Sequence, residues 1–238
     1  IASLHQGGGP ARTPDGWERL EAAGLLGEHI NIVHGHALSD AQLARFCDLG
    51  MSFSAAAESE MSQGHGHPLT GRLRALGRAP SLGVDLESVM SGDMISQARI
   101  ALGIQRSLDN VAHRAAHGTI PDTSTITTRE ALAWITIEGA RMLRQQHRIG
   151  SLAAGKQADL VLIRADDLNM QPVHDPVSAV VLQASLANID SVMVAGRWRK
   201  RHGRLVDVDL PPLLDALRAS GHKITQALGM GRTEGVIA

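Results

Sequence analysis

The stretch IGSLAAGKQADLVLI, from Ile149 to Ile163, marks a change in the organisation of this chain. Gly150 and Gly155 indicate a tight connection, because glycine adopts backbone conformations that are closed to other residues. The four residues from Leu160 to Ile163 form a short apolar run that suits a buried strand. The stretch therefore predicts a turn followed by a core strand, and the pattern of the sequence differs on its two sides.

Before this stretch, short apolar runs alternate with amphipathic segments. The runs predict four strands, at Ile1–Leu4, Ile30–Val33, Met51–Ala55 and Ser81–Val84. The segments between them predict helices at Gly16–Ala23, at Asp40–Leu49 with Ser39 as N-cap, and at Thr70–Leu76. A repeat of roughly 20 to 30 residues per strand and helix is typical of a parallel sheet built from βα units. Four such units amount to about half of an eight-stranded barrel.

The rest of the chain predicts more helices and a second group of strands. We expect a long helix over Asp93–His117 and another after Thr127 or Thr128, because Thr127–Glu130 matches a capping box. Beyond Ile149 we expect strands near 159–164, 178–183 and 189–194, a basic exposed strand at 198–202, and a final helix at 210–228. These features predict three parts, at residues 1–148, 149–209 and 210–238.

The composition excludes several classes of protein. With 238 residues, 43% of them hydrophobic, and a net charge of −1 without a basic stripe, the chain lacks the electrostatic footprint of a nucleic-acid-binding protein. It contains no apolar run near the roughly 20 residues that cross a bilayer, so we expect no membrane partner. Cys47 is the single cysteine, which suits a reducing compartment, and we expect a cytoplasmic protein. Any metal would be held by histidine and carboxylate side chains.

Polar residues stand where the predicted parallel strands end. His5 follows the first strand, His34 the second and Asp85 the fourth, while Glu58 and Glu60 follow the third. In parallel βα folds, the carboxyl ends of the strands carry the ligand-binding residues. Each residue alone has an ordinary interpretation, such as a hydrogen-bonded structural histidine. Together they form a donor set suited to a divalent metal such as Zn²⁺ or Fe²⁺.

Several motifs resemble the amidohydrolase superfamily, in its cytosine deaminase and chlorohydrolase-like branch. The similarity runs from about residue 1 to about residue 206, and its motifs are Val33–Asp40, Leu82–Asp85, Thr127–Leu132, Glu138–Arg141 and the stretch Ile149–Ile163. The resemblance implies an α/β fold, a partial TIM (β/α)₈ barrel comprising strands five to eight. Part of a small β-sandwich and a C-terminal helix would follow the barrel.

The resemblance also implies a chemistry for three residues. His5 would be a metal ligand, and Asp85 would touch both the metal and the nucleophilic water. His34 would orient the water or the departing group of the substrate. The implied reaction is metal-dependent hydrolysis of a carbon–nitrogen bond other than a peptide bond, in a small cyclic amide, amidine or amino-substituted heterocycle.

Two features depart from the pattern of that branch. The first-strand His-x-His pair, which supplies further metal ligands, has no counterpart, since the chain begins at the fifth strand. The glutamate that usually stands three residues after the fifth-strand histidine is replaced by Gly8. Glu58 or Glu60 would then have to supply this carboxylate near the substrate, and we expect His65 to line the site.

The alternative hypothesis is a catalytically incomplete remnant that acts as a scaffold or assembly subunit. Its basis is the missing ligand pair, together with a first residue, Ile1, that already lies inside a predicted strand. We therefore expect a fragment: either a longer protein has lost its N-terminal half, or this chain covers only part of a gene product. A half barrel exposes two unpaired sheet edges, which favour pairing with another chain, so we also expect a homo-oligomer.

Overall fold

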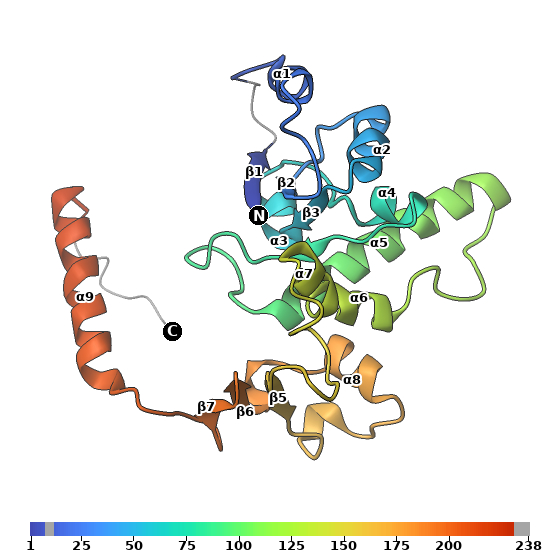
Figure 1. Cartoon of the computed structure of the whole chain (residues 1–238). Coiled ribbons are helices and arrows are strands. Elements are labelled where there is room, and N and C mark those ends of the chain that lie inside the picture. Colours follow the sequence, from blue (N-terminus) through green and yellow to red (C-terminus); the bar gives the residue numbers. More distant parts are fainter. Residues whose placement is uncertain (8–11, 231–238) are drawn as a thin grey trace.

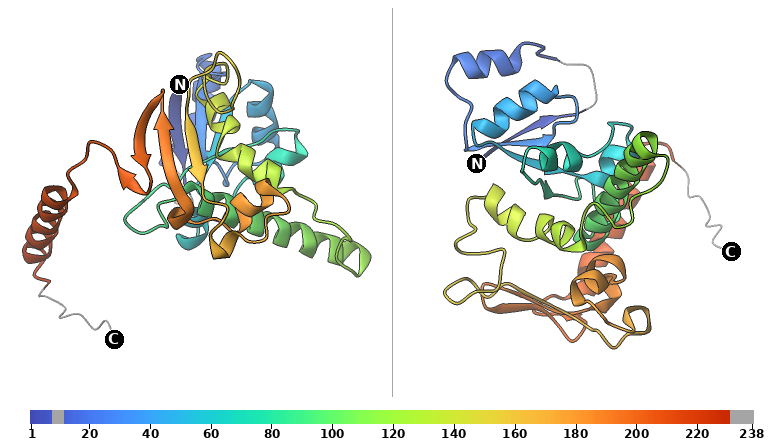
Figure 2. Two further views of the ribbon diagram at one scale, coloured as in Figure 1. Left: turned by 90° about the horizontal axis from the view of Figure 1, so that it is seen from below. Right: turned by 90° about the vertical axis from the view of Figure 1, so that its right-hand side faces the viewer.

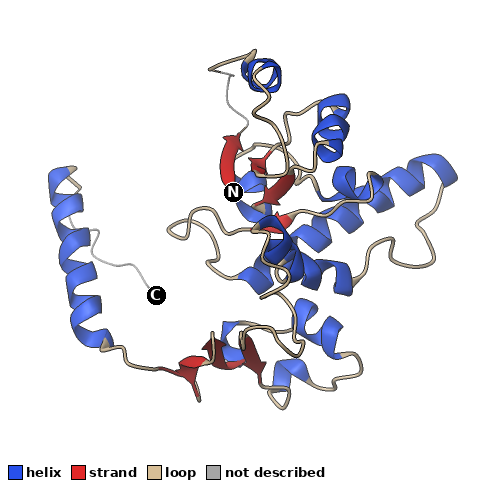
Figure 3. Cartoon of the chain, in the orientation of Figure 1, coloured by secondary structure: helices blue, strands red, loops and turns tan. Residues whose placement is uncertain are grey.

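The computed structural model describes residues 1–7 and 12–230 and contains two separate sheets (Figures 1 and 3). One sheet is parallel and lies in the first part of the chain, and the other is antiparallel and lies in the last part. Helices pack beside the parallel sheet and lie between the two sheets along the chain (Figure 2). Within residues 1–7 and 12–230, no helix is both long enough and apolar enough to cross a membrane.

The parallel sheet has the strand order β1-β2-β3-β4, which follows the order of the sequence. Its strands are β1 (Ala2–Gln6), β2 (Ile30–His34), β3 (Ser52–Ala55) and β4 (Ser81–Leu82). The connecting helices are α1 (Gly16–Ala22), α2 (Asp40–Asp48), α3 (Ala57–Ser62) and α4 (Thr70–Ala75). The four predicted strands and the three predicted helices among these elements are confirmed. The short helix α3 was not predicted.

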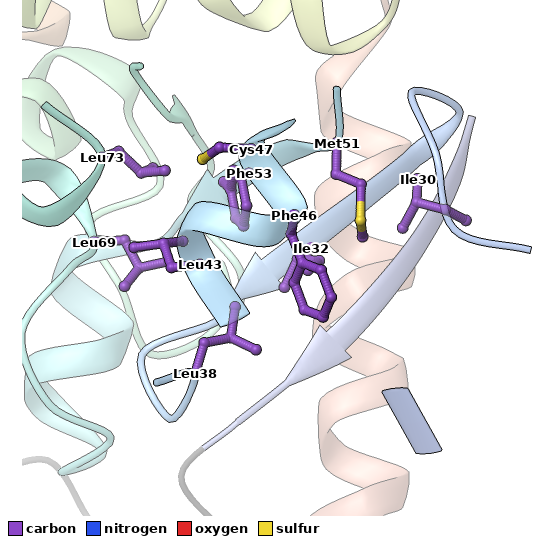
Figure 4. Close-up of a cluster of buried hydrophobic side chains, with 10 residues drawn as sticks. All are labelled: Ile30, Ile32, Leu38, Leu43, Phe46, Cys47, Met51, Phe53, Leu69 and Leu73. Carbon is purple, nitrogen blue, oxygen red and sulfur yellow. The ribbon is translucent and has the colours of Figure 1, made fainter. Parts of the chain in front are cut away.

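One face of this sheet is covered by α2 and α4 (Figure 4). Ile32 of β2 and Phe53 of β3 pack there against Leu43 and Phe46 of α2 and Leu73 of α4, and all five side chains are buried. Helix α2 begins at a capping box in which Ser39 and Gln42 bond reciprocally, as its sequence predicts. Apolar side chains at alternate strand positions thus fix which face of the sheet turns toward the helices.

The opposite face of the sheet carries a polar network. Asn31 donates to Ser3 of β1 at 3.2 Å and accepts from Ser52 and Ser54 of β3, also at 3.2 Å. His5 lies two residues after Ser3 on the same strand, so it belongs to this polar face. The face without helices is therefore the one that presents a candidate functional side chain.

Three helices follow the parallel sheet: α5 (Met94–His117), α6 (Thr128–Trp134) and α7 (Ile137–Met142). Asp93 caps α5 through a 2.7 Å bond from the Ser96 amide, and Thr127 caps α6 with a complete capping box. Both expected helices are confirmed, because their starts are specified by local side-chain hydrogen bonds.

The antiparallel sheet has the order β5-β6-β7-β8. It comprises β5 (Leu160–Ile163), β6 (Ile189–Val194), β7 (Arg197–Arg201) and β8 (Arg204–Leu205), with the short 3₁₀ helices η1 (Leu168–Met170) and η2 (Leu186–Asn188) beside it. The strands expected near 159–164 and 189–194, and the basic strand, are confirmed. The expectation that Leu160–Ile163 is a buried core strand is wrong, because Val161 and Leu162 of β5 are 55% and 48% exposed.

The strand expected at 178–183 is wrong, because this segment belongs to helix α8 (Pro176–Leu182). Its start is set by Asp175, whose carboxylate accepts from the amides of Val177 and Ser178 at 3.2 and 3.1 Å. Pro176 occupies the first turn, where its missing N–H costs nothing. A short apolar run is compatible with either element, and here the capping residues decide for the helix.

The last helix, α9 (Leu210–Ala227), stands apart from the other elements (Figures 1 and 2). None of its residues is buried. Its exposed apolar side chains include Leu213, Leu217 and Ile224.

Candidate active site

The sequence-predicted residues lie at the carboxyl ends of the parallel strands. His5 is the fourth residue of β1, His34 is the last residue of β2, and Asp85 follows β4 after two residues. The register pairs Gln6 of β1 with His34 of β2. Helix α3, which begins directly beyond β3, carries Glu58 and Glu60. One edge of the sheet therefore holds the candidate residues.

His34 and Glu60 form a buried pair at this edge. The Nδ1 atom of His34 lies 3.0 Å from Oε1 of Glu60, and the two side chains are 5% and 0% exposed. The hydrogen bond to Glu60 raises the pKa of His34 above its ordinary 6.5, although burial acts in the opposite direction. The backbone of His34 has φ of +69°, a left-handed conformation that is costly for a residue other than glycine. Strain of this kind is typical of functional sites.

Three further imidazoles surround His34. The ring centroids of His5 and His65 lie 5.4 and 5.6 Å from that of His34, both in edge-to-face arrangements. His36 lies 5.5 Å from His65 and 6.4 Å from His34. Burial lowers the pKa of His36 below its ordinary value. The structure thus brings together His5, His34 and His65, and adds His36, which the sequence reasoning did not select.

Several hydrogen-bonding atoms in this region are buried without a partner. They belong to four side chains and are Gln6 Oε1, His36 Nδ1 and Nε2, Glu60 Oε2 and His65 Nδ1. Buried polar atoms are usually hydrogen-bonded, so a group of such atoms is typical of a place where a ligand or ordered water binds. The spacing of His34 and His36 was the signal that could have identified His36 in the sequence.

Asp85 is held by the same helix that holds His34. Ser59 of α3 donates from its hydroxyl to Oδ2 of Asp85 at 2.5 Å, and Gln63 donates to that hydroxyl at 2.7 Å. Asp85 also has a left-handed backbone, with φ of +70°. Ser59 is fully buried. Nothing in its sequence position indicated this contact.

Glu58 bonds away from the histidines, toward the loop beyond Asp85. Its Oε2 accepts from the amide and hydroxyl of Ser91 at 2.9 and 2.6 Å, and from Gln97 at 2.8 Å. The hydrogen bonds from Ser91 lower the pKa of Glu58. Its neighbour Glu60, by contrast, faces His34. Gly8, where the resemblance implies a glutamate, lies outside the described residues.

The donor atoms do not by themselves complete a metal site. Among residues 1–7 and 12–230, no three or more His, Cys, Asp or Glu side chains are arranged so that they could hold a metal ion. His5 and Asp85 are nevertheless ligands of the right chemical type, at one sheet edge. The described part of the chain would therefore supply only some of the ligands of a metal ion, and other residues would have to complete the shell.

Two cavities lie at opposite ends of the parallel sheet. One of about 650 Å³ is lined by His5 and Gln6 of β1 and by Trp17. Another of about 620 Å³ lies where β3 and β4 begin. Three arginines of this second cavity are engaged in ion pairs, Arg74 with Glu130, Arg141 with Glu138 and Arg144 with Glu28. We place the candidate site at the first end, because the strained and buried polar groups gather there.

Comparison with known proteins gives consistent results. The model of the Amidohydrolase family matches residues 2–199. The 8-oxoguanine deaminase of Pseudomonas aeruginosa is 36% identical over 202 residues, which are 84% of this chain and 42% of that protein. A 5-methylthioadenosine/S-adenosylhomocysteine deaminase of Teredinibacter turnerae is 30% identical over 75% of this chain and 38% of its own length. This chain thus spans less than half of the length of these relatives.

Solved structures give the same fold. A zinc-bound adenosine deaminase from Xanthomonas campestris superposes with a TM-score of 0.78 and 26% identity, over 88% of this chain and 46% of that one. The atrazine chlorohydrolase of Arthrobacter aurescens, in complex with zinc and atraton, gives a TM-score of 0.73 at 21% identity, over 91% of this chain and 48% of its own, a likeness of fold alone.

Proposed function

Because this chain belongs to the amidohydrolase family, we propose that it forms part of a metal-dependent hydrolase of carbon–nitrogen bonds other than peptide bonds. The observation that carries the proposal is the placement of His5, His34 and Asp85 at the carboxyl edge of a parallel sheet. Two relatives that match this chain over 84% and 75% of its length are named as deaminases. This favours an enzyme over the alternative of a catalytically incomplete scaffold.

In this proposal the parallel sheet corresponds to strands five to eight of a (β/α)₈ barrel. Residues 1–148 form that half barrel, residues 149–209 form part of a small β-sandwich, and residues 210–238 form the C-terminal helix and tail. The parallel order β1-β2-β3-β4 and the separate antiparallel sheet support this division.

The half barrel would contribute two ligands, His5 and Asp85, to a divalent metal, Zn²⁺ or Fe²⁺. The remaining ligands would come from residues of the longer protein, since the described residues do not complete a shell. A metal bound there would lower the pKa of a water ligand to about 7 and so supply a nucleophile at neutral pH.

Asp85 would move the proton. Its Oδ2 accepts from Ser59, which leaves Oδ1 available to take a proton from the attacking water. The same oxygen can then return that proton to the departing nitrogen, so Asp85 acts first as general base and then as general acid. The bond from Ser59 holds the carboxylate in one orientation throughout.

His34 would stabilise the tetrahedral intermediate and orient the water or the leaving group. Its Nδ1 faces Glu60, so Nε2 is the nitrogen that remains for the substrate. The hydrogen bond to Glu60 raises the pKa of His34, which would help Nε2 to take up a proton as negative charge develops on the substrate.

The substrate would be a small polar heterocycle with an exocyclic amino group, or a cyclic amide or amidine. The printed names of the relatives support this class, because 8-oxoguanine and 5-methylthioadenosine are both amino-substituted purine compounds. His65 and Glu60 would line the site, each with a buried atom that has no partner within the protein. Glu58 would contribute to the substrate site indirectly, by binding Ser91 in the loop beyond Asp85.

The experiment is to measure ammonia release from a panel of amino-substituted purines and pyrimidines. It uses the full-length protein that contains this chain, loaded with zinc, beside its His34→Ala variant. The proposal requires release from at least one compound and its loss in the variant. A full-length protein that takes up zinc and releases no ammonia from any compound would favour the scaffold.

We also propose that this chain by itself forms a homo-oligomer, with the unpaired edge strands β1 and β4 of its parallel sheet as the candidate contacts. Sedimentation velocity tests this proposal, and a well-behaved monomer at high protein concentration would exclude it.

A further inference from the structure

His34 is held by a carboxylate that the reaction described above does not use. The contact joins Nδ1 of His34 to Oε1 of Glu60 at 3.0 Å, and Glu60 has no exposed surface. The two residues are 26 positions apart and come from different elements, β2 and α3. A glutamate is almost never fully buried unless it has a specific partner. The His34–Glu60 pair is therefore a specific structural contact at this edge of the sheet.

Glu60 determines which nitrogen of His34 carries a proton. An ionised carboxylate only accepts hydrogen bonds, so the proton between the two residues belongs to Nδ1 of the imidazole. The backbone N–H of Ala56 donates to the same Oε1 at 2.9 Å, which fixes that oxygen in place. With Nδ1 facing Glu60, the ring presents Nε2 on its other side.

Helix α3 is anchored by the two residues that precede Glu60. Ser59 bonds Asp85 at 2.5 Å, and Glu58 bonds Ser91 and Gln97. The amide of Glu60 also donates to the carbonyl of Ala56 at 2.8 Å. Glu60 is therefore held by its own backbone as well as by its carboxylate, so its position does not depend on a ligand.

We propose that Glu60 is a positioning residue that fixes the Nδ1–H tautomer and the ring orientation of His34, so that Nε2 is the nitrogen offered to the substrate. The proposal rests on the role of His34 in the proposed function. It assigns the Oε1 atom of Glu60 to the histidine and leaves its buried Oε2 atom for the substrate site. Partners that orient a functional histidine typically contribute 10- to 100-fold to activity.

The direct test is ¹⁵N NMR of the histidine rings in the full-length protein at alkaline pH, where the rings are neutral. The His34 signals are identified by their loss in a His34→Gln variant. We expect a protonated Nδ1 and an unprotonated Nε2 for His34. An unprotonated Nδ1 in the wild-type protein would overturn the proposal, whatever the activity.

Two substitutions of Glu60 separate orientation from structure. Glu60→Met keeps the length of the side chain and removes the acceptor, so we expect His34 to lose its Nδ1–H preference and kcat to fall by about 10- to 100-fold with little change in KM. Glu60→Gln keeps a carbonyl acceptor and should restore the tautomer and much of the rate. If Glu60→Met does not fold, the ¹⁵N spectra of the wild-type protein and of Glu60→Gln still test whether His34 carries its proton on Nδ1.

The matched control is Glu130→Met, which removes a partly exposed member of a capping box far along the chain. We expect it to lower folding stability without changing the His34 spectrum or kcat. An unchanged tautomer in Glu60→Met contradicts the proposal. Failure of the proposed function has a different signature: no hydrolysis by the wild-type protein, while the His34 tautomer still reports on Glu60.

Discussion

Ser59 and Asp85 are joined by a 2.5 Å hydrogen bond, from the Ser59 hydroxyl to Oδ2 of the carboxylate, although they lie 26 positions apart. The next residue of α3, Glu60, bonds His34. Two neighbouring residues of one short helix thus hold the two side chains to which we assign the chemistry. The orientation of both depends on α3, which makes this helix a focus for experiments.

Ser59→Ala removes the bond to Asp85 and should lower kcat by about tenfold, because a partner that orients a reacting group contributes at least that much. KM should change little, since Ser59 is buried beside Asp85. The measurement is steady-state kinetics of the zinc-loaded full-length protein. Ser62→Ala, at an exposed position of the same helix, is the control. Equal kcat values in both variants would refute the role of Ser59.

Gly150→Ala should destabilise the fold more than Gly155→Ala, by about 1–3 kcal/mol. Both glycines have positive φ, of +84° and +87°, so the backbone strain of the two substitutions is similar. A Cβ at Gly150 would lie 2.6 Å from Cβ of Ala140, whereas a Cβ at Gly155 would meet no atom within 4 Å. Urea unfolding measures the difference, and equal midpoints would show that this packing contributes nothing.

Asp175 should contribute stability that is lost at acid pH. The hydrogen bond from Ser178 lowers the pKa of Asp175 below its ordinary 3.8. A carboxyl whose pKa is lowered by folding stabilises the fold above its ordinary pKa, and this contribution disappears as the pH falls through the folded value. Asp175→Asn keeps a good N-cap without the charge. The stability difference between wild type and variant should be constant from about pH 7 to about pH 5 and shrink below about pH 4. A difference that grows on acidification would contradict this assignment.

Thr127→Ala should cost about 1 kcal/mol of folding stability, the usual effect of removing an N-cap. The Thr127 hydroxyl accepts from the amide of Glu130 at 3.2 Å, and the Glu130 carboxylate accepts from the amide of Thr127 at 2.8 Å. Thr123→Ala, in the exposed loop before α6, is the matched control and should change stability by less than about 0.5 kcal/mol. Thermal unfolding compares the two, and equal losses would exclude a specific cap.

Features set by local sequence could be predicted. The caps at Ser39 and Thr127 depend on residues three positions apart, and both capping boxes form. The strands ending near His5 and His34 follow from short apolar runs between helical segments. The incorrect strand prediction, at 178–183, concerns an apolar run that is compatible with the periodicity of a strand and with that of a helix. The Asp175-Pro176 pair at the start of this segment is a helix-start signal, and it identifies the segment as a helix.

Features set by contacts between distant residues could not be predicted. The position of Glu60 after a strand end predicts a substrate contact. Its contact with His34 could not be predicted, because it depends on how α3 directs the Glu60 side chain toward β2. Ser59 was not selected, since no spacing in the sequence links it to Asp85. The parallel pairing of β2 with β3 and of β3 with β4 brings these segments together, and it is a property of the folded sheet.

The central claim is that Asp85 both binds the metal and transfers the proton during hydrolysis. The measurement that tests it most directly is the zinc content and the rate of ammonia release of the full-length protein, compared between wild type and Asp85→Ala. We predict that the variant retains much less zinc and releases no ammonia above background. A variant with the zinc content and the hydrolysis rate of the wild type would contradict the assignment.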